Sequence, residues 1–317
     1  MSFFQKQQLG TRMKSVFSKF KFLSFFSTKM PDFDIEFQDD DIFTQCFDVS
    51  HKITTKFLNK YSISKLTKLF EKHGILPRLR SLNVQPILEI DTKELYSHHL
   101  YIYERDQCEP EKAFVRLIIG PQPKFFGCEK HKTIKGMEKG RKFFECNLQG
   151  DLQVLDMKWI SMQNTQAKFT KKRPRFPGQK CPGFGMMTQA IKVLNELADN
   201  DGIANEPMHF HNAVFSKAFK FVNPCFQGWF DSLREDLGDE IQKQGLSKVS
   251  WAIFYGGLRD KDGNKIEWEG EDMVQGKTEK VSKYFQSEGY RKYYNAAKFS
   301  RGFYIDWDSV KEKMSKN

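Results

Sequence analysis

A basic loop with closely spaced glycines, followed directly by an amphipathic helix, is the feature that most constrains this chain of 317 residues. The helix is predicted over Met187–Ala198, because its apolar residues recur at intervals of three and four. Gly183 and Gly185 precede it, and they allow the backbone to turn tightly and to bring several N–H groups near a ligand. The positive end of the helix dipole points toward the same loop. Further positive charge comes from Arg173, Arg175 and Lys180. The stretch therefore predicts a site for a phosphorylated ligand.

Two known phosphate-binding patterns do not fit this loop. The P-loop requires a lysine and a hydroxyl residue directly after its second glycine, whereas Gly183 is followed by Phe184 and Gly185. The dinucleotide fingerprint fails because Thr188 stands where a third glycine is required. What remains is Lys180, two further residues, and Gly-x-Gly opening a helix. This pattern resembles the pyrophosphate loop of the GNAT superfamily of acyl-CoA N-acyltransferases, Gln/Arg-x-x-Gly-x-Gly/Ala.

The elements predicted around the loop follow the order of the same family over residues 96–221. A hairpin is predicted from 100–103 and 113–119, with an exposed loop at 120–140, and further strands at 143–147, 152–162 and 202–207. A helix is predicted at 209–221. The resemblance implies an α/β fold with a GNAT-like mixed central sheet flanked by helices, and with N- and C-terminal extensions.

The chain is expected to divide into four parts. Residues 1–31 form a basic tail or targeting segment, and 32–95 an acidic linker followed by a helical extension with a helix at 50–73. Residues 96–225 form the GNAT-like acyl-CoA-binding core. Residues 226–317 form a C-terminal extension, with helices predicted at 229–242 and 278–298, a strand at 249–255, and a hairpin turn at Asp262–Gly263 leading to a return strand at 265–269.

Composition limits the partners and the compartment. The net charge of +11 favours acidic partners such as nucleic acid, an anionic membrane face or a phosphorylated cofactor. None of the six cysteines forms a C-x-x-C pair, so reduced thiols are expected and zinc is not. No run of 18 apolar residues predicts a membrane span. Residues 1–31 lack Asp and Glu and carry an apolar face, which is typical of a mitochondrial targeting segment; the alternative is a basic tail on a cytoplasmic protein.

The resemblance also implies which residues hold the cofactor, acetyl-CoA or another acyl-CoA. The pyrophosphate contacts would come from Lys180, Cys181, Gly183, Phe184 and Gly185. Met162 and its neighbours would supply the strand edge for the pantetheine arm, and Asn212 could touch that arm or cap a helix. The alternative is an ordinary basic loop whose glycines serve tight packing.

Acyl transfer to an amine requires a base for the ammonium and an acid for the leaving thiolate. Candidate bases are Glu145 and Asp156 at strand ends, and His209 and His211 where a helix begins. At positions i and i+2 of a helix the two histidines would point to different sides, so at most one would face the site. No third ligand stands near them, so a metal role is not expected. The family often uses a tyrosine as the acid, and the nearest aromatic here is Phe215, which cannot donate a proton.

The leading hypothesis is therefore an acyl-CoA-dependent N-acyltransferase, with acetyl-CoA as donor and an unidentified amine, on a small molecule or a protein, as acceptor. One alternative is a non-catalytic GNAT-like subunit of a larger assembly, which the long extensions and the missing tyrosine favour. The other is a basic nucleic-acid-associated protein, although the basic residues are dispersed and no familiar nucleic-acid motif occurs.

Overall fold

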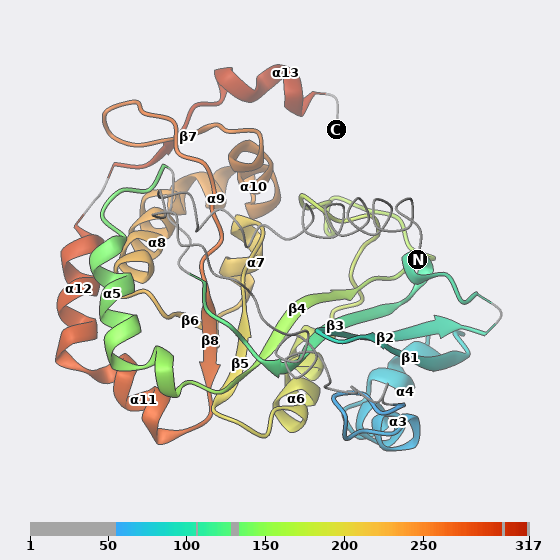
Figure 1. The fold of residues 1–317 in the computed structure, drawn as a ribbon. Coiled ribbons are helices and arrows are strands. Elements are labelled where there is room, and N and C mark those ends of the chain that lie inside the picture. The colour runs from blue at the N-terminus through green and yellow to red at the C-terminus, as the bar shows by residue number, and fades with distance from the viewer. Residues whose placement is uncertain (1–54, 106, 128–132, 300–301, 316–317) are drawn as a thin grey trace, which may run out of the picture. The chain divides into compact units, whose positions relative to one another are not determined.

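A mixed β-sheet with helices against both faces lies at the centre of the computed structural model (Figure 1). The structure describes residues 55–105, 107–127, 133–299 and 302–315. Residues Lys52–Asn317 form one compact unit. The predicted tail 1–31 and the acidic part of the predicted linker lie outside the described residues. The predicted α/β class, with a mixed sheet flanked by helices, is confirmed.

The sheet has seven strands in the order β1-β2-β3-β4-β5-β8-β6. Strands β1 to β4 form an antiparallel meander. Among the described strands, β4 and β5 are the only parallel neighbours, and β8 lies between β5 and β6, antiparallel to both. The bounds are β1 Pro86–Glu94, β2 Ser97–Glu104, β3 Val115–Pro123, β4 Val154–Met162, β5 Gly202–Asn205, β6 Lys220–Phe221 and β8 Met273–Gly276. A separate antiparallel pair joins β7 Leu258–Arg259 to β9 Tyr304–Ile305.

The helices occupy the connections and both ends of the described chain. Those before β6 are α3 Ile63–Lys72, α4 Ile75–Arg80, α5 Glu138–Asn147, α6 Met187–Leu197 and α7 Phe210–Phe215. Those after it are α8 Pro224–Asp236, α9 Gly238–Gln244, α10 Leu246–Phe254, α11 Glu279–Gln286, α12 Glu288–Lys298 and α13 Lys311–Met314. Within the described ranges, no helix has both the length and the apolar character needed to cross a membrane.

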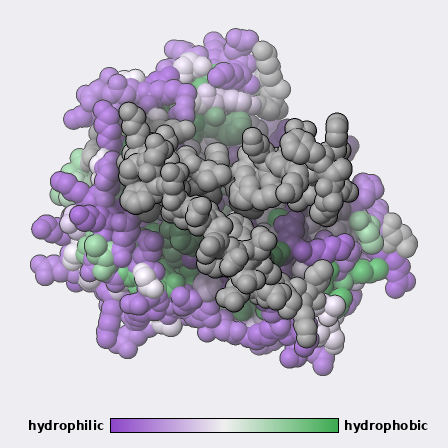
Figure 2. All heavy atoms as spheres, in the orientation of Figure 1, coloured by the Kyte–Doolittle hydropathy of each residue, from purple (hydrophilic) through white to green (hydrophobic). Residues whose placement is uncertain are grey.

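On the face drawn in Figure 2, hydrophilic side chains cover most of the visible described surface, and hydrophobic patches are scattered among them.

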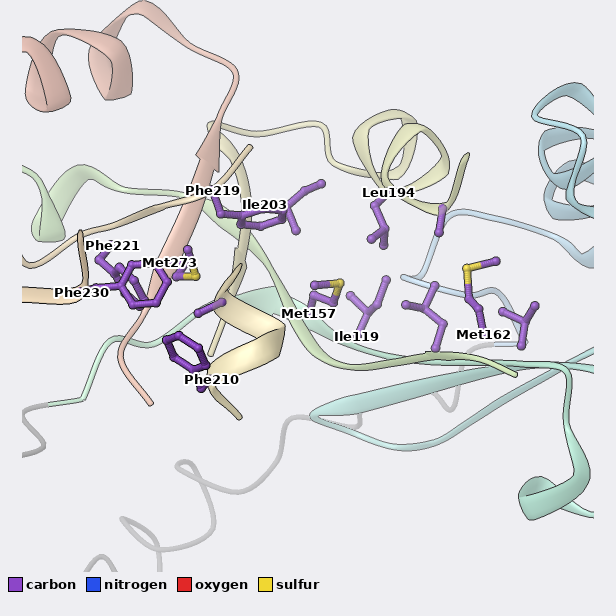
Figure 3. Close-up of a cluster of buried hydrophobic side chains, with 14 of the residues drawn as sticks. Ile119, Met157, Met162, Leu194, Ile203, Phe210, Phe219, Phe221, Phe230 and Met273 are labelled. Atoms are coloured by element: carbon purple, nitrogen blue, oxygen red, sulfur yellow. The ribbon is translucent and has the colours of Figure 1, made fainter. Parts of the chain in front are cut away.

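One face of the sheet packs against α6. Its buried residues recur at helical spacing, as Ala190, Val193, Leu194 and Leu197, and they join the main core cluster. Figure 3 shows Leu194 of α6 facing Met157 and Ile119 of the sheet. The same cluster includes Ile203 of β5. The amphipathic pattern of this helix is therefore explained by burial against the sheet.

The opposite face packs against α5 and α11. Val154, Ala204 and Val274 come from three neighbouring strands and join a second cluster with Phe144 of α5 and Tyr284 of α11. Neighbouring residues on a strand point to opposite faces, so Ile203 and Ala204 enter different clusters. Burial on both faces explains why β5 is a continuous apolar run rather than an alternating one.

The elements nearest the predicted loop agree with the sequence analysis. The predicted strands at 100–103, 113–119, 152–162 and 202–207 correspond to β2, β3, β4 and β5, and the predicted helix Met187–Ala198 corresponds to α6. The predicted helices at 229–242 and 278–298 are also present in interrupted form, as α8 with α9 and as α11 with α12. The second interruption lies at Ser287, which caps α12.

Five predicted elements differ in the structure. The predicted strands at 143–147 and 249–255 belong to helices α5 and α10. The predicted helix 209–221 ends at Phe215, and its last residues form β6. The predicted helix 50–73 begins only at Ile63, where Ser62 accepts a hydrogen bond from the Lys65 N–H. The predicted return strand at 265–269 is reduced to one bridge between Arg259 and Lys265. Strands β1 and β8 were not predicted.

Candidate functional site

The central parallel strands β4 and β5 pair over a short stretch and then part (Figure 1). Their register runs from Val154 opposite Gly202 to Asp156 opposite Ala204. Beyond Asp156, β4 continues to Met162 paired with β3, and among the described strands none pairs with its other edge. A β-bulge at Lys158 interrupts the register with β3 at the same point, and bulges bend a strand. The parting leaves part of the β4 backbone open to an extended ligand.

The glycine loop is held at the carboxyl end of β4. Gln163 and Gly183 form an isolated β-bridge, and the Asn164 N–H donates to the Pro182 carbonyl at 2.6 Å. A Cβ on Gly183 would lie 3.3 Å from the Met162 carbonyl oxygen. The structure therefore brings together four of the predicted cofactor residues, Met162, Gly183, Phe184 and Gly185. Met162 and Phe184 are buried, whereas both glycines are exposed.

The other two predicted loop residues have different surroundings. Lys180 Nζ lies 2.9 Å from Glu111 Oε2, and both side chains are exposed. The hydrogen bond and charge of Lys180 lower the pKa of the Glu111 carboxyl. The ammonium of Lys180 is thus paired with a carboxylate, and an anion bound at the loop would compete with Glu111 for this ammonium. Cys181 is a half-buried free thiol.

Helix α6 begins at this loop without a cap of its own. Met186 occupies the N-cap position and makes no side-chain hydrogen bond, and the first turn contains no acidic residue. Gly185, immediately before it, has φ +78° and no atom within 4 Å of the position of a Cβ. The first N–H groups of a helix have no intrahelical acceptor, and those of Met187, Thr188 and Gln189 find none among the described residues. Such a turn attracts an anion.

The two histidines lie side by side at the start of α7. His209 is the N-cap residue, with φ −134° and ψ 152°, and His211 is in the first turn. Their rings stack with centroids 5.5 Å apart and an interplanar angle of 12°. The expectation that they point to different sides is wrong, because it assumed that both residues are helical and His209 is extended.

The glycine-rich loop packs against this histidine pair. The ring of Phe176 lies 4.7 Å from that of His211, measured between centroids. Gly178, at φ +77°, lies under His209, so that a Cβ there would be 2.7 Å from His209 Nε2. Phe215 makes an edge contact with Phe176 at 5.4 Å. The loop after β4 therefore leads into α6 and also packs against the start of α7.

Burial keeps both imidazoles neutral. It lowers the pKa of His209 below the usual value. Burial, assisted by His209, lowers the pKa of His211 to about 3. The ring of His211 is almost fully enclosed, so it does not take up a proton near neutral pH.

Three buried polar atoms around the parting strands lack a hydrogen-bond partner among the described residues. They are Asn205 Oδ1 at the end of β5, Gln189 Oε1 in the first turn of α6, and His211 Nδ1 in the first turn of α7. All three segments follow the carboxyl ends of β4 and β5, the edge at which open α/β sheets bind ligands. Each of these atoms can form a hydrogen bond with a molecule bound at this edge. The side chain of the predicted Asn212 is exposed instead.

Asp156 lies where the strands part, within a half-buried charged group that was not predicted from the sequence. Lys124 Nζ is 3.4 Å from Asp156 Oδ1 and 3.0 Å from Asp272 Oδ1. Burial raises the pKa of Asp272 to about 6, although Lys124 opposes the shift. Burial disfavours the charge of Lys124, yet Asp272 and Asp156 raise its pKa. The adjacent acids at Glu271–Asp272 were the signal in the sequence, but their place beside Asp156 depends on β8.

Glu145 does not belong to this site. It lies exposed on α5, so the prediction of a carboxylate at a strand end is wrong for this residue. Within the described ranges, no group of three His, Cys, Asp or Glu side chains could hold a metal ion.

The chain was compared with protein-family models, curated proteins and solved structures, and none matches.

Proposed function

We propose that the chain is a GNAT-like N-acyltransferase that uses acetyl-CoA or a related acyl-CoA. The observation that carries the proposal is the parting of β4 and β5 after Asp156, with a glycine loop and an uncapped helix start at the same edge. An extended pantetheine arm can pair with the open β4 backbone as an added strand does. The N–H groups at the start of α6 suit the pyrophosphate. This combination agrees with the family pattern Lys180-x-x-Gly183-x-Gly185.

Two groups near the parting strands can take the proton from the acceptor amine. Neutral His209 is free to accept a proton, since no described residue hydrogen-bonds to its ring. Asp272 has a pKa of about 6, so in most molecules its carboxyl is ionised at neutral pH and can act as a base. We assign the role to His209, because the loop after β4 packs on it and it lies half-buried at the start of α7.

Calorimetric titration of the full chain with coenzyme A and acetyl-CoA tests the cofactor site. We expect saturable binding of both, weaker binding of dephospho-coenzyme A, and little binding of pantetheine, because the phosphates supply the anion contacts. An absence of binding at millimolar coenzyme A would contradict the proposal. Release of free thiol from acetyl-CoA in the presence of amines then measures turnover.

His209→Gln tests the base. We expect kcat to fall by roughly 10²–10⁴ while the affinity for acetyl-CoA stays unchanged. His99→Gln, on β2, is the control and should keep full turnover. Because burial lowers the pKa of His209, the rate should stay level above pH 6.5 and fall only below it. Full turnover in the His209→Gln variant would show that His209 is not the base.

A non-catalytic GNAT-like subunit is the second candidate function. Phe215 in place of a tyrosine and the low pKa of His211 favour it, since neither side chain can donate a proton near neutral pH. Saturable binding of acetyl-CoA without thiol release, across small-molecule and peptide amines, would support this candidate over the transferase.

A further inference from the structure

A cavity that includes no residue of the Lys180–Gly185 loop opens beside His209. Its volume is about 480 Å³, within the range of small-molecule sites. Its walls come from the start of α7, from α10 and the turn after it, from residues 265–268, and from α13. His209 therefore borders both this cavity and the loop after β4, because Gly178 of that loop lies under its ring. A molecule in the cavity would lie next to the proposed base.

Five of the twelve residues that line this cavity are aromatic, and the cavity is partly open. Phe254 is 52% exposed and Met208 64% exposed, so each presents apolar surface at the cavity. The indole of Trp268 is held by a hydrogen bond from its Nε1 to the Pro207 carbonyl at 3.1 Å. The ring of His209 meets Phe254 edge-on at 5.6 Å. Fixed aromatic walls of this kind favour a flat, apolar ligand body.

The charged side chains that line the cavity carry a net positive charge. Lys265 Nζ pairs with Glu267 Oε1 at 2.7 Å. Lys313 donates to the Tyr255 carbonyl at 3.4 Å and has no carboxylate partner among the described residues. Two ammonium groups thus face one carboxylate, while burial keeps His209 neutral. The remaining positive charge favours a ligand with one anionic group.

We infer that this cavity binds a ring-bearing apolar molecule with one carboxylate, and that this molecule is the acyl acceptor, an amine of the aromatic amino acid class. The binding of the carboxylate stands on the cavity alone, whereas the acceptor role rests on the proposed function. In the reaction, His209 takes one proton from the ammonium. The amine nitrogen bonds to the thioester carbonyl carbon and the C–S bond breaks. The thiolate of coenzyme A leaves and takes up a second proton from the nitrogen.

Titrations of the full chain with three probes test the ligand class. Indole-3-propionate carries ring and carboxylate, tryptamine carries ring and ammonium, and propionate carries only the carboxylate. We expect the tightest binding for indole-3-propionate. The double variant Lys265→Gln, Lys313→Gln should raise its dissociation constant roughly threefold to tenfold and leave that of tryptamine within about twofold. Phe254→Ala should weaken both indole probes alike.

The matched control is Lys261→Gln with Lys311→Gln, which removes the same charge from exposed positions outside the cavity. It should leave the binding of indole-3-propionate unchanged. Equal binding of tryptamine and indole-3-propionate, or equal effects of the two lysine pairs, would overturn the inferred ligand class. The single variant Lys313→Gln gives the same comparison if the double variant does not fold.

Turnover with acetyl-CoA separates this inference from the proposed function. We expect faster thiol release with tryptophan than with tryptamine, and loss of that preference in the lysine pair variant. Binding of acetyl-CoA with turnover of other amines but not of tryptophan would overturn the acceptor role alone. Binding of indole-3-propionate without any binding of coenzyme A would instead overturn the proposed function and leave the cavity as a carboxylate site.

Discussion

Gly183 allows charge and size to be tested separately at the glycine loop. A Cβ at this position would approach the Met162 carbonyl oxygen at 3.3 Å, so Gly183→Asn and Gly183→Asp make the same contact and carry side chains of equal size. Only the aspartate adds a negative charge beside a bound pyrophosphate. We expect Gly183→Asp to weaken coenzyme A binding at least about tenfold more than Gly183→Asn does. Calorimetric titration measures both, and equal effects would contradict a phosphate at this position.

His211 makes stability depend on pH in a direction that follows from its burial. Its pKa is about 3 in the folded chain and about 6.5 when unfolded. Below pH 6.5 the unfolded chain binds more protons, so the free energy of unfolding falls as the pH is lowered toward 3. At pH 5 we expect a loss of about 2 kcal/mol relative to neutral pH. Urea unfolding at the two pH values measures it.

Asp272 acts in the opposite sense, so the contribution of His211 must be isolated by difference. Because burial raises the pKa of Asp272 to about 6, its contribution is present at low pH and is lost as the pH rises through 6. His211→Gln removes only the histidine contribution. The stability of this variant should fall less between neutral pH and pH 5 than that of the wild type. An unchanged pH dependence would show that the pKa of His211 is the same in the folded and the unfolded chain.

Strand β5 depends on close contact with β8, an element that had no clear signal in the sequence. Gly202 has φ +149°, and a Cβ there would lie 2.0 Å from the Gln275 carbonyl oxygen of β8. We therefore expect Gly202→Ala to lower the free energy of unfolding by about 3 kcal/mol. Gly150→Ala, where no atom lies within 4 Å, is the control and should change stability by less than about 1 kcal/mol. Similar stability of the two variants would show that the β5–β8 pairing can adjust.

Elements with a sustained periodic pattern were predicted correctly, and short or mixed ones were not. Helix α6 buries residues at intervals of three and four over eleven positions, which identifies it from sequence. In contrast, Val249–Tyr255 is rich in β-branched and aromatic residues, yet α10 buries Val249, Ala252 and Ile253 on one helical face. The tertiary packing therefore outweighs the local β propensity. Strand β8 has four residues, too few for any period to emerge.

Site residues could be predicted from the sequence where they lie close together along the chain, and could not where long-range packing brings them together. Gly183, Phe184 and Gly185 follow one another and open a helix, so their proximity is local and visible in the sequence. Asp156 and Asp272 are more than a hundred residues apart, and Lys124 joins them only because β8 enters the sheet beside β5. The pairing of His209 with His211 was misjudged because it depends on the extended backbone of an N-cap residue.

At the scale of the whole molecule, the main core cluster draws on both ends and the middle of the described chain. The main cluster includes Leu66 of α3, Leu194 of α6, and Val310 close to the C-terminus. Segments predicted as extensions on either side of a core at 96–225 thus share buried contacts with it. The cavity beside His209 also combines both sides, since α7 lies within residues 96–225 and α10 lies beyond them. The proposed acceptor site therefore requires the C-terminal segment.

Truncation tests whether residues 96–225 can fold without the C-terminal segment. Strand β8 lies between β5 and β6, so a chain of residues 52–225 would leave the inner edge of β5 and both edges of β6 unpaired. It would also expose Ile203, Phe221 and Val154, which pack against residues of β8 or of later helices. We expect the fragment 52–317 to unfold in one cooperative thermal transition and the fragment 52–225 to show none. Calorimetry and circular dichroism measure both. A cooperative transition in the shorter fragment would show that the sheet forms without β8, and would support residue 225 as the end of the predicted core.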